Sequence, residues 1–240
     1  MNLCNTSLMR LSRRQFLGGL LLIACCPGIT LAAGGLTVST SRVLIESGKT
    51  AAGIVISNNS TTQFLTKSWI EDRSGNKSDQ VMAVPPVAYA PPGKHIRFQI
   101  MVLNPEELPT DQESLFYFHS HSVPGNGNPD NALTVAFDMK LKVFYRPEGL
   151  DGSMASAIED LKWSFKNGVL TAVNDSKYHI SLVTYGINGD YTELQDCVIK
   201  PGTSVDFKTT KKYPQTLNIE WAAMDDFGSA MTASAKIDNE

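Results

Sequence analysis

The chain has 240 residues, of which 42% are hydrophobic and 19% are charged, and its formal net charge at pH 7 is −3. This is the composition of a globular protein with room for one large domain or two small ones, and it argues against a disordered chain or a coiled coil. The acidic balance gives no support to a nucleic-acid partner, which would require a basic surface.

The first 33 residues have the features of an export signal. An apolar, glycine-rich run at 16–26 is followed by small residues up to a cleavage-compatible Ala33, and three arginines precede the run: Arg10, Arg13 and Arg14. We therefore expect residues 1–33 to be a signal peptide and the mature protein to lie outside the cytoplasm.

Two details of this leader leave alternatives open. The stretch SRRQFLGG at 12–19 resembles a twin-arginine signal, but Gly18 stands where that motif usually has a lysine, so a general secretory signal fits equally. The stretch LIAC at 22–25 fits a lipoprotein box, so lipidation of Cys25 competes with cleavage near Ala33. We favour the later cleavage.

With cleavage near Ala33, the cysteines exclude an internal disulfide from the mature protein. Three of the four lie in the leader, at Cys4, Cys25 and Cys26, so Cys197 remains without a partner. The fold must therefore be stabilised by its hydrophobic core.

Strand-like segments separated by short turn signals follow the leader to the end of the chain. They lie at 53–72, 94–103, 114–123, 133–147, 161–175, 178–187, 196–207 and 216–228, and no window predicts a capped amphipathic helix. The small, polar segment at 148–160 interrupts this series. The pattern predicts an all-β protein of two β-sandwich domains, at 34–148 and 149–240.

The stretch LTVAFDMKLKVFYRP at 133–147 alternates with a period of two, as a long strand does. Its apolar row consists of Leu133, Val135, Phe137, Met139, Leu141, Val143 and Tyr145. Such a row must be buried, either in the core of its own domain or against another protein. The pattern alone favours the first interpretation.

Local patterns that suggest an enzyme or a metal site are weak. The stretch SGKT at 47–50 lacks the earlier glycine of a phosphate-binding loop, and His119 and His121 share a strand face without further metal ligands. Asp225 and Asp226 would point to opposite faces of a strand, which prevents them from acting as an acid and base pair. We expect no catalytic residue, no metal and no cofactor, with an exported hydrolase as a remote alternative.

Several motifs, in order along the chain, resemble the periplasmic chaperones of the chaperone–usher pilus pathway. In the first domain they are SWIED at 68–72, VPP at 84–86, LPTDQESLFYF at 108–118 and LKVFYRP at 141–147. Weaker matches follow at 161–163, at 174–182, where the family usually has prolines, and at 225–228. The short turn before the alternating stretch resembles the short-loop branch of the family.

This resemblance implies two immunoglobulin-like domains set at an angle, with a cleft between them, in a protein of the periplasm. Such a chaperone lends an edge strand to a pilus subunit (pilin) whose own sandwich lacks a strand, and an outer-membrane usher then receives the subunit. Pilins and an usher are therefore the expected partners. Self-association of the free chaperone is left open, and so is the alternative of a non-chaperone, lipid-anchored binding module.

The resemblance also implies roles for individual residues. Leu133, Val135 and Phe137 match the donor strand, and Met139 extends the row as an optional fourth member. These side chains would fill successive pockets of the pilin.

Two further groups of residues match charged positions of the family. Arg42 and Lys142 match the two cations that hold the C-terminal carboxylate of the pilin, and an interdomain charged cluster is matched by Glu113, Arg146 and Asp226. One departure is Gln112, which replaces an arginine common beside Glu113. Lys142 also lies on the opposite parity from the donor row, which would require strand twist or a bulge to bring it into the cleft.

Overall fold

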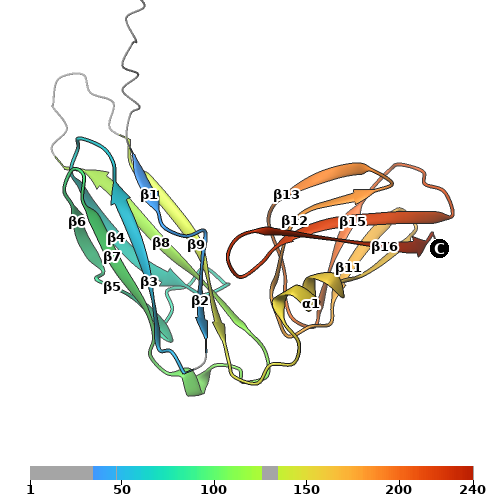
Figure 1. Cartoon of the computed structure of the whole chain (residues 1–240), viewed down its shortest axis with the longest axis horizontal. Helices are drawn as coiled ribbons and strands as arrows, with labels where there is room; N and C mark the ends of the chain where they lie inside the picture. The colour runs from blue at the N-terminus through green and yellow to red at the C-terminus, as the bar shows by residue number, and fades with distance from the viewer. Residues whose placement is uncertain (1–34, 47, 126–134, 240) are drawn as a thin grey trace, which may run out of the picture. The chain divides into compact units, whose positions relative to one another are not determined.

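The computed structural model describes residues 35–46, 48–125 and 135–239, which fold as two β-sandwiches (Figure 1). The predicted all-β class with two immunoglobulin-like sandwiches is confirmed. The expected signal peptide, the box that ends at Cys25 and Leu133 of the donor row lie outside the described residues. The angle and the cleft between the sandwiches stay predictions. Across the described ranges, no helix is long and apolar enough to cross a membrane.

The first sandwich consists of a four-stranded and a five-stranded sheet. The four-stranded sheet has the order β1 (Leu36–Val38), β3 (Ala51–Asn58), β7 (His95–Val102) and β5 (Val81–Val84). The five-stranded sheet has the order β2 (Arg42–Glu46), β9 (Phe137–Arg146), β8 (Ser114–Pro124), β4 (Phe64–Glu71) and β6 (Val87–Ala90). The short 3₁₀ helix η1 (Pro105–Glu107) follows β7.

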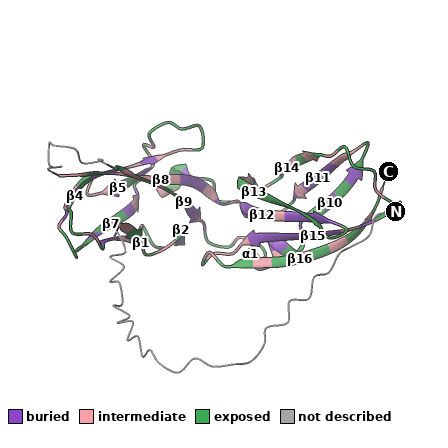
Figure 2. Cartoon of the chain, turned by 90° about the horizontal axis from the view of Figure 1, so that it is seen from above, coloured by how far each residue is buried: buried purple, intermediate pink, exposed green. Residues whose placement is uncertain are grey.

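Alternating apolar residues of these strands form the core of the first sandwich. On β4 and β7 every second residue is buried, as a period of two requires. The largest fully buried side chains are Phe98, Phe118 and several isoleucines. Figure 2 shows the buried residues lying along the strands of the two sheets.

The second sandwich has its own core. Its three-stranded sheet has the order β10 (Lys162–Lys166), β11 (Val169–Asn174) and β14 (Thr203–Lys208). Its four-stranded sheet has the order β13 (Asp190–Ile199), β12 (Ile180–Ile187), β15 (Thr216–Met224) and β16 (Ala230–Asp238). Trp163 and Trp221 pack together in this core with ring centroids 5.5 Å apart.

The prediction that the chain lacks a capped helix was wrong at one place. Residues Met154–Glu159 form the helix α1, whose first turn is capped by Ser153: the backbone N–H of Ser156 donates to Ser153 Oγ. Met154, Ala157 and Ile158 are buried against the second core. A helix of 6 residues is too short to show a helical period in the sequence. Only the Ser-x-x-Ser spacing signalled this helix.

The alternating stretch begins its strand later than predicted. β9 starts at Phe137, and the preceding Val135 and Ala136 are not in a strand. The ladder with β8 ends at the pair Ser122 and Phe137, and β8 itself ends at Pro124, which has no N–H to donate. Alternation alone could not show where the hydrogen-bonding partner stops.

Asp225 and Asp226 are also placed differently from the prediction. They lie in the turn between β15 and β16, not on a strand. Asp225 Oδ1 accepts hydrogen bonds from the backbone N–H groups of Phe227 and Ser229, so this carboxylate stabilises the turn. Asp226, in the same turn, binds Arg146 of the first sandwich instead.

Candidate functional site

β9 has two halves that differ in their neighbours. From Phe137 to Tyr145 it pairs with β8, in a register without a shift. On its other side the parallel strand β2 pairs only with residues 142–146 of β9, because the chain before Arg42 belongs to the other sheet, where β1 pairs with β3. Among the described residues, no strand pairs with the edge of β9 from Phe137 to Leu141, so its backbone groups there are open to a further strand.

The apolar row is likewise divided between exposed and buried positions. Val135, ahead of the strand, is 50% exposed. Phe137 and Met139 are half-buried against the first core, and the Phe137 ring meets Phe64 edge-on at 5.5 Å. Further along β9 the row becomes core, because Leu141, Val143 and Tyr145 are all buried. The expected donor residues therefore occupy the less buried half of the row.

Arg42 and Lys142 lie directly opposite each other on β2 and β9. Neighbours in register point to the same face of a sheet, so the pairing brings the two cations together. The ladder of β9 on β8 contains no bulge, so Lys142 stays on the face opposite to the apolar row. The sequence had suggested that a bulge could bring Lys142 into the cleft, and β9 contains none in its ladder with β8.

Arg42 is a buried cation with an incomplete set of hydrogen bonds. Its side chain lies near the Phe144 ring, 5.9 Å from the centroid, and Nη1 donates to the Met224 carbonyl at 3.4 Å. Nε is buried and has no hydrogen-bond partner among the described residues. Burial lowers the pKa of Arg42, and the nearby charges of Asp225, Asp226 and Glu113 offset this only in part.

The turn between β15 and β16 covers this cation. Gly228 has a φ of +85°, and a Cβ at that position would collide with Ser41 Oγ and come within 4.0 Å of Arg42 Nε. Glycine at 228 gives the turn both this left-handed conformation and this close approach to the start of β2.

Lys142, in contrast, has a partner. Its Nζ lies 2.6 Å from Asp196 Oδ1 of β13, and its side chain is 21% exposed against 54% for Asp196. The sequence prediction did not include Asp196. Asp196 is the first residue of the strand-like segment at 196–207, and an aspartate at that position carries no signal of such a contact.

The three residues of the expected charged cluster meet around the Arg146 guanidinium. Nε donates to Glu113 Oε1 at 2.8 Å, while Nη1 and Nη2 bind both oxygens of Asp226 at 2.8 and 2.6 Å. Arg146 and Glu113 come from the first sandwich and Asp226 from the second, so the cluster joins the two. Burial alone would lower the pKa of Arg146, but its bonds to Asp226 and Glu113 raise it above the ordinary value.

Glu113 connects the sandwiches a second time. Its other oxygen, Oε2, accepts a hydrogen bond from the backbone N–H of His179 at 2.8 Å, and its own N–H donates to the Lys177 carbonyl at 3.0 Å. The Glu113 side chain is fully buried, so these bonds compensate a charge removed from water. Glu113 therefore contacts the second sandwich through both its side chain and its backbone.

The histidine pair occupies separate environments on the outer face of the five-stranded sheet. His119 stacks on Trp69 at 5.1 Å and has Nε2 3.0 Å from Glu71 Oε2, without hydrogen-bond geometry. His121 contacts Asp138 at 2.6 Å. Residues 35–46, 48–125 and 135–239 contain no cluster of three His, Cys, Asp or Glu side chains that could hold a metal.

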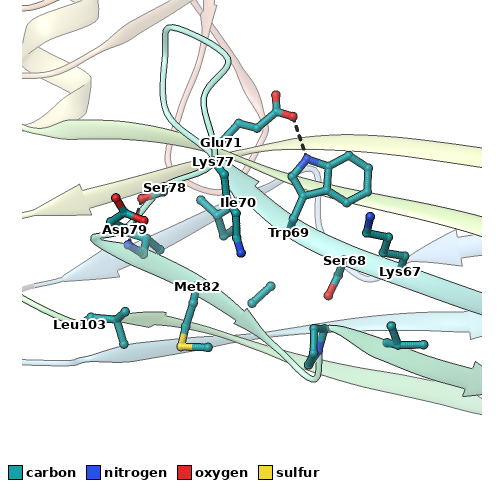
Figure 3. Close-up of a pocket in the computed structure, with 14 residues that line it drawn as sticks. Lys67, Ser68, Trp69, Ile70, Glu71, Lys77, Ser78, Asp79, Met82 and Leu103 are labelled. Atoms are coloured by element: carbon teal, nitrogen blue, oxygen red, sulfur yellow. Dashed lines mark hydrogen bonds between the residues drawn. The ribbon is translucent and has the colours of Figure 1, made fainter.

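A cavity of about 570 Å³ lies elsewhere on the first sandwich, where the chain crosses from β5 to β6 (Figure 3). Its lining includes Trp69, whose Nε1 donates to Glu71 at 2.7 Å, and the apolar side chains of Met82 and Leu103. None of the expected site residues lines this cavity.

Comparisons with known proteins agree with this architecture. Residues 35–151 match the family model for the N-terminal domain of PapD, a pili and flagellar-assembly chaperone, and residues 156–235 match that for the C-terminal domain of the pili assembly chaperone PapD. The chaperone protein FimB/FhaD of Bordetella pertussis is 29% identical over 92% of this chain and 94% of its own length. The probable fimbrial chaperone LpfB of Escherichia coli O157:H7 is 27% identical over 82% of this chain and 86% of its own length.

Solved structures show the same fold. The crystal structure of the YadV chaperone superposes with a TM-score of 0.73 at 25% identity and covers 84% of this chain and 98% of its own. The SafB chaperone of Salmonella enterica, solved in complex with the SafA pilin, superposes with a TM-score of 0.75 at 20% identity over 84% of this chain and 95% of its own. The two matching models cover most of both sandwiches, and the chain therefore belongs to the PapD family of pilus assembly chaperones.

Proposed function

We propose that this protein is a periplasmic chaperone that binds pilus subunits by donor-strand complementation and delivers them to an outer-membrane usher. The observation that carries the proposal is the unpaired edge of β9 from Phe137 to Leu141, which leads directly to the two cations Arg42 and Lys142. A free edge next to a pair of cations suits an extended segment that ends in a carboxylate.

The edge would supply both affinity and tolerance of sequence. Backbone N–H and C=O groups pair with an added strand whatever its side chains, while the row from Leu133 to Met139 would enter pockets of the client. Each apolar side chain that becomes buried contributes roughly 1.5–3 kcal/mol before the cost of association is subtracted. In the free protein the Val135 side chain is half exposed, and a pocket of the client would bury it.

The two cations would set the register of the client strand. A carboxylate at the end of that strand can form charge-assisted hydrogen bonds with Lys142 Nζ and with the unpartnered Nε of Arg42. Because the pair lies at the first register position of β2, a carboxylate held there aligns the client's last residues with the free half of β9.

The charged cluster would hold the two sandwiches in position for this contact. The bonds of Arg146 to Glu113 and Asp226 hold the β15–β16 turn over Arg42, so the cluster and the cation site share one structural support. The export signal expected in the sequence would direct this chemistry to the periplasm, and a pilin is the partner seen with the structurally similar SafB chaperone.

A co-expression experiment tests the proposal. The chain is produced in the periplasm with the pilus subunit encoded nearest to it, and the subunit recovered with the chaperone is measured for wild type, Lys142→Ala and Lys140→Ala. Lys140 is the matched control because it lies on the same face of β9, two residues away, with its Nζ over the Tyr117 ring. We expect Lys142→Ala to lose the subunit and Lys140→Ala to retain it. Full recovery with Lys142→Ala, in a chaperone that is itself folded, would refute the anchor.

A further inference from the structure

Lys142 is not free to receive a client in the structure, because Asp196 of the second sandwich already binds it. The contact joins Lys142 Nζ and Asp196 Oδ1 at 2.6 Å. We propose that Asp196 is an internal counter-ion, which occupies Lys142 in the empty chaperone and is replaced by the client's terminal carboxylate. This inference rests on the proposed function and adds to it a residue that sets the affinity for the client.

A bulge in β13 directs Asp196 toward Lys142. Leu182 of β12 pairs with Cys197, but Thr184 pairs with Glu193, so three residues of β13 face the single Val183. Asp196 belongs to this bulge and has a φ of +51°, in the left-handed region that aspartate tolerates better than most residues. Bulges commonly redirect a side chain out of the regular ladder, and here the redirected group is a carboxylate.

The carboxylates near the two cations are otherwise engaged. Asp226 and Glu113 bind Arg146, and Asp225 Oδ1 accepts backbone N–H groups of its own turn. Nothing among the described residues accepts a hydrogen bond from Arg42 Nε, which is buried. The pair of cations is therefore half satisfied: Lys142 has an internal carboxylate, and Arg42 lacks one.

A client carboxylate can complete the pair only if Asp196 moves away. Two carboxylates at one ammonium repel each other, so the incoming group and Asp196 compete for Lys142. The Asp196 side chain is 54% exposed and can return to water at little cost, whereas Lys142 is 21% exposed and stays in place. Ion pairs with an exposed partner are weak, so Asp196 holds the site without blocking it.

Peptide binding to the full mature chain tests this exchange. The probe is a synthetic, fluorescein-labelled peptide of about 15 residues with alternating valine and threonine, long enough to add a strand along β9 and ending in a free carboxylate. Its twin ends in an amide. Affinities are measured by fluorescence anisotropy for wild type, Asp196→Asn and Glu193→Gln, the last being a matched loss of one exposed carboxylate from the same strand.

We expect Asp196→Asn to bind the carboxylate peptide about twofold to fivefold more tightly than wild type, as loss of a weak competing ion pair predicts. The amide peptide should show no such gain, and Glu193→Gln should behave as wild type. If wild type prefers the carboxylate peptide but Asp196→Asn binds it no better, the counter-ion role is wrong and the proposed function stands. If wild type does not distinguish the two peptides, both fail.

A second measurement needs no client. The rate at which Lys142 is acetylated by an N-hydroxysuccinimide ester, followed by mass spectrometry, reports whether its ammonium is paired in the empty chaperone. Asp196→Asn should raise this rate and Glu193→Gln should not. An equal rate in wild type and Asp196→Asn would overturn the proposal, whatever the peptides show.

Discussion

Arg42 and Lys142 are paired residue to residue on the neighbouring strands β2 and β9, yet they differ in their partners: Lys142 binds Asp196, whereas the buried Nε of Arg42 binds nothing among the described residues. A buried cation without a full set of hydrogen bonds is costly to keep. A buried Nε that still lacks an acceptor is what a site for an incoming anion would provide.

Replacement of Arg42 by methionine should therefore separate stability from binding. Burial of an incompletely bonded guanidinium opposes folding, so Arg42→Met should unfold with a free energy equal to wild type or about 1–2 kcal/mol higher. The same variant should lose capture of a pilus subunit. Urea denaturation and co-purification measure the two properties.

Arg146→Met is the matched comparison, because it removes a half-buried arginine whose Nε, Nη1 and Nη2 are all bonded to carboxylates. Glu113 would be left buried and unpaired, and the free energy of unfolding should fall by about 3–5 kcal/mol. Equal losses in the two variants would show that Arg42 also serves the fold.

A negative charge at Val135 should abolish capture of a pilus subunit, whereas the same charge at Ala136 should not. Val135→Asp puts a carboxylate into the expected donor row at a half-exposed position, so the chaperone should fold while capture of the subunit is lost. Ala136→Asp adds the same charge at the next, exposed residue, on the other parity, and should retain capture. The ratio of subunit to chaperone after affinity purification is the measurement. Loss in both variants would mean that added charge alone, and not the row, disturbs binding.

Glu113 should contribute more to stability than other acidic residues. Glu113→Ala leaves Arg146 Nε and the His179 backbone N–H without their shared acceptor, although Arg146 keeps Asp226, and should lower the free energy of unfolding by about 1–3 kcal/mol. Glu106→Ala, in the exposed helix η1, should change it by less than about 0.5 kcal/mol. Urea unfolding curves of both variants test the difference. A small effect of Glu113→Ala would mean that the junction finds another acceptor.

His119 should make the first sandwich less stable in acid. Burial lowers its pKa from the ordinary value of 6.5, assisted by Lys140 and opposed by the attraction of Glu71. The unfolded chain therefore takes up a proton at a higher pH than the folded one, so this contribution to stability is complete above about pH 6.5 and is lost as the pH falls further.

Thermal unfolding of His119→Phe between pH 7.5 and about pH 5 checks this expectation, since the variant should lose less stability on acidification than wild type. His95→Gln, at an exposed position in the other sheet, serves as control and should follow wild type. An unchanged pH dependence in His119→Phe would assign the acid sensitivity to other groups.

Much of the fold could be predicted from the sequence because a strand can be recognised from its own residues and the turns beside it. The alternation on β4, β7 and β8 is visible in the order of their residues, and their turns are marked by glycine, asparagine and proline. The helix α1 was not predicted because it is shorter than the window in which a helical period can be recognised. The start of β9 was predicted too early because a strand begins only where it has a hydrogen-bonding partner. Alternation of polar and apolar residues carries no information about that partner.

The site was predictable only in part. Glu113, Arg146 and Asp226 were expected together through resemblance to a family, and in the structure Arg146 binds both Glu113 and Asp226, while their role in orienting the domains stays a prediction. Asp196 was not expected, because its contact with Lys142 depends on a bulge and a left-handed backbone conformation that a sequence does not display.

The all-β class, most strands and the apolar row at 133–145 follow from the order of polar and apolar residues along the chain, so they could be predicted without any knowledge of contacts. The extent of the unpaired edge of β9, and which cation is already paired, could be learned only from the folded molecule. Those facts depend on where β2 begins to pair with β9 and on which carboxylate of the second sandwich reaches Lys142. Both are contacts between residues far apart in the chain, which local patterns do not encode.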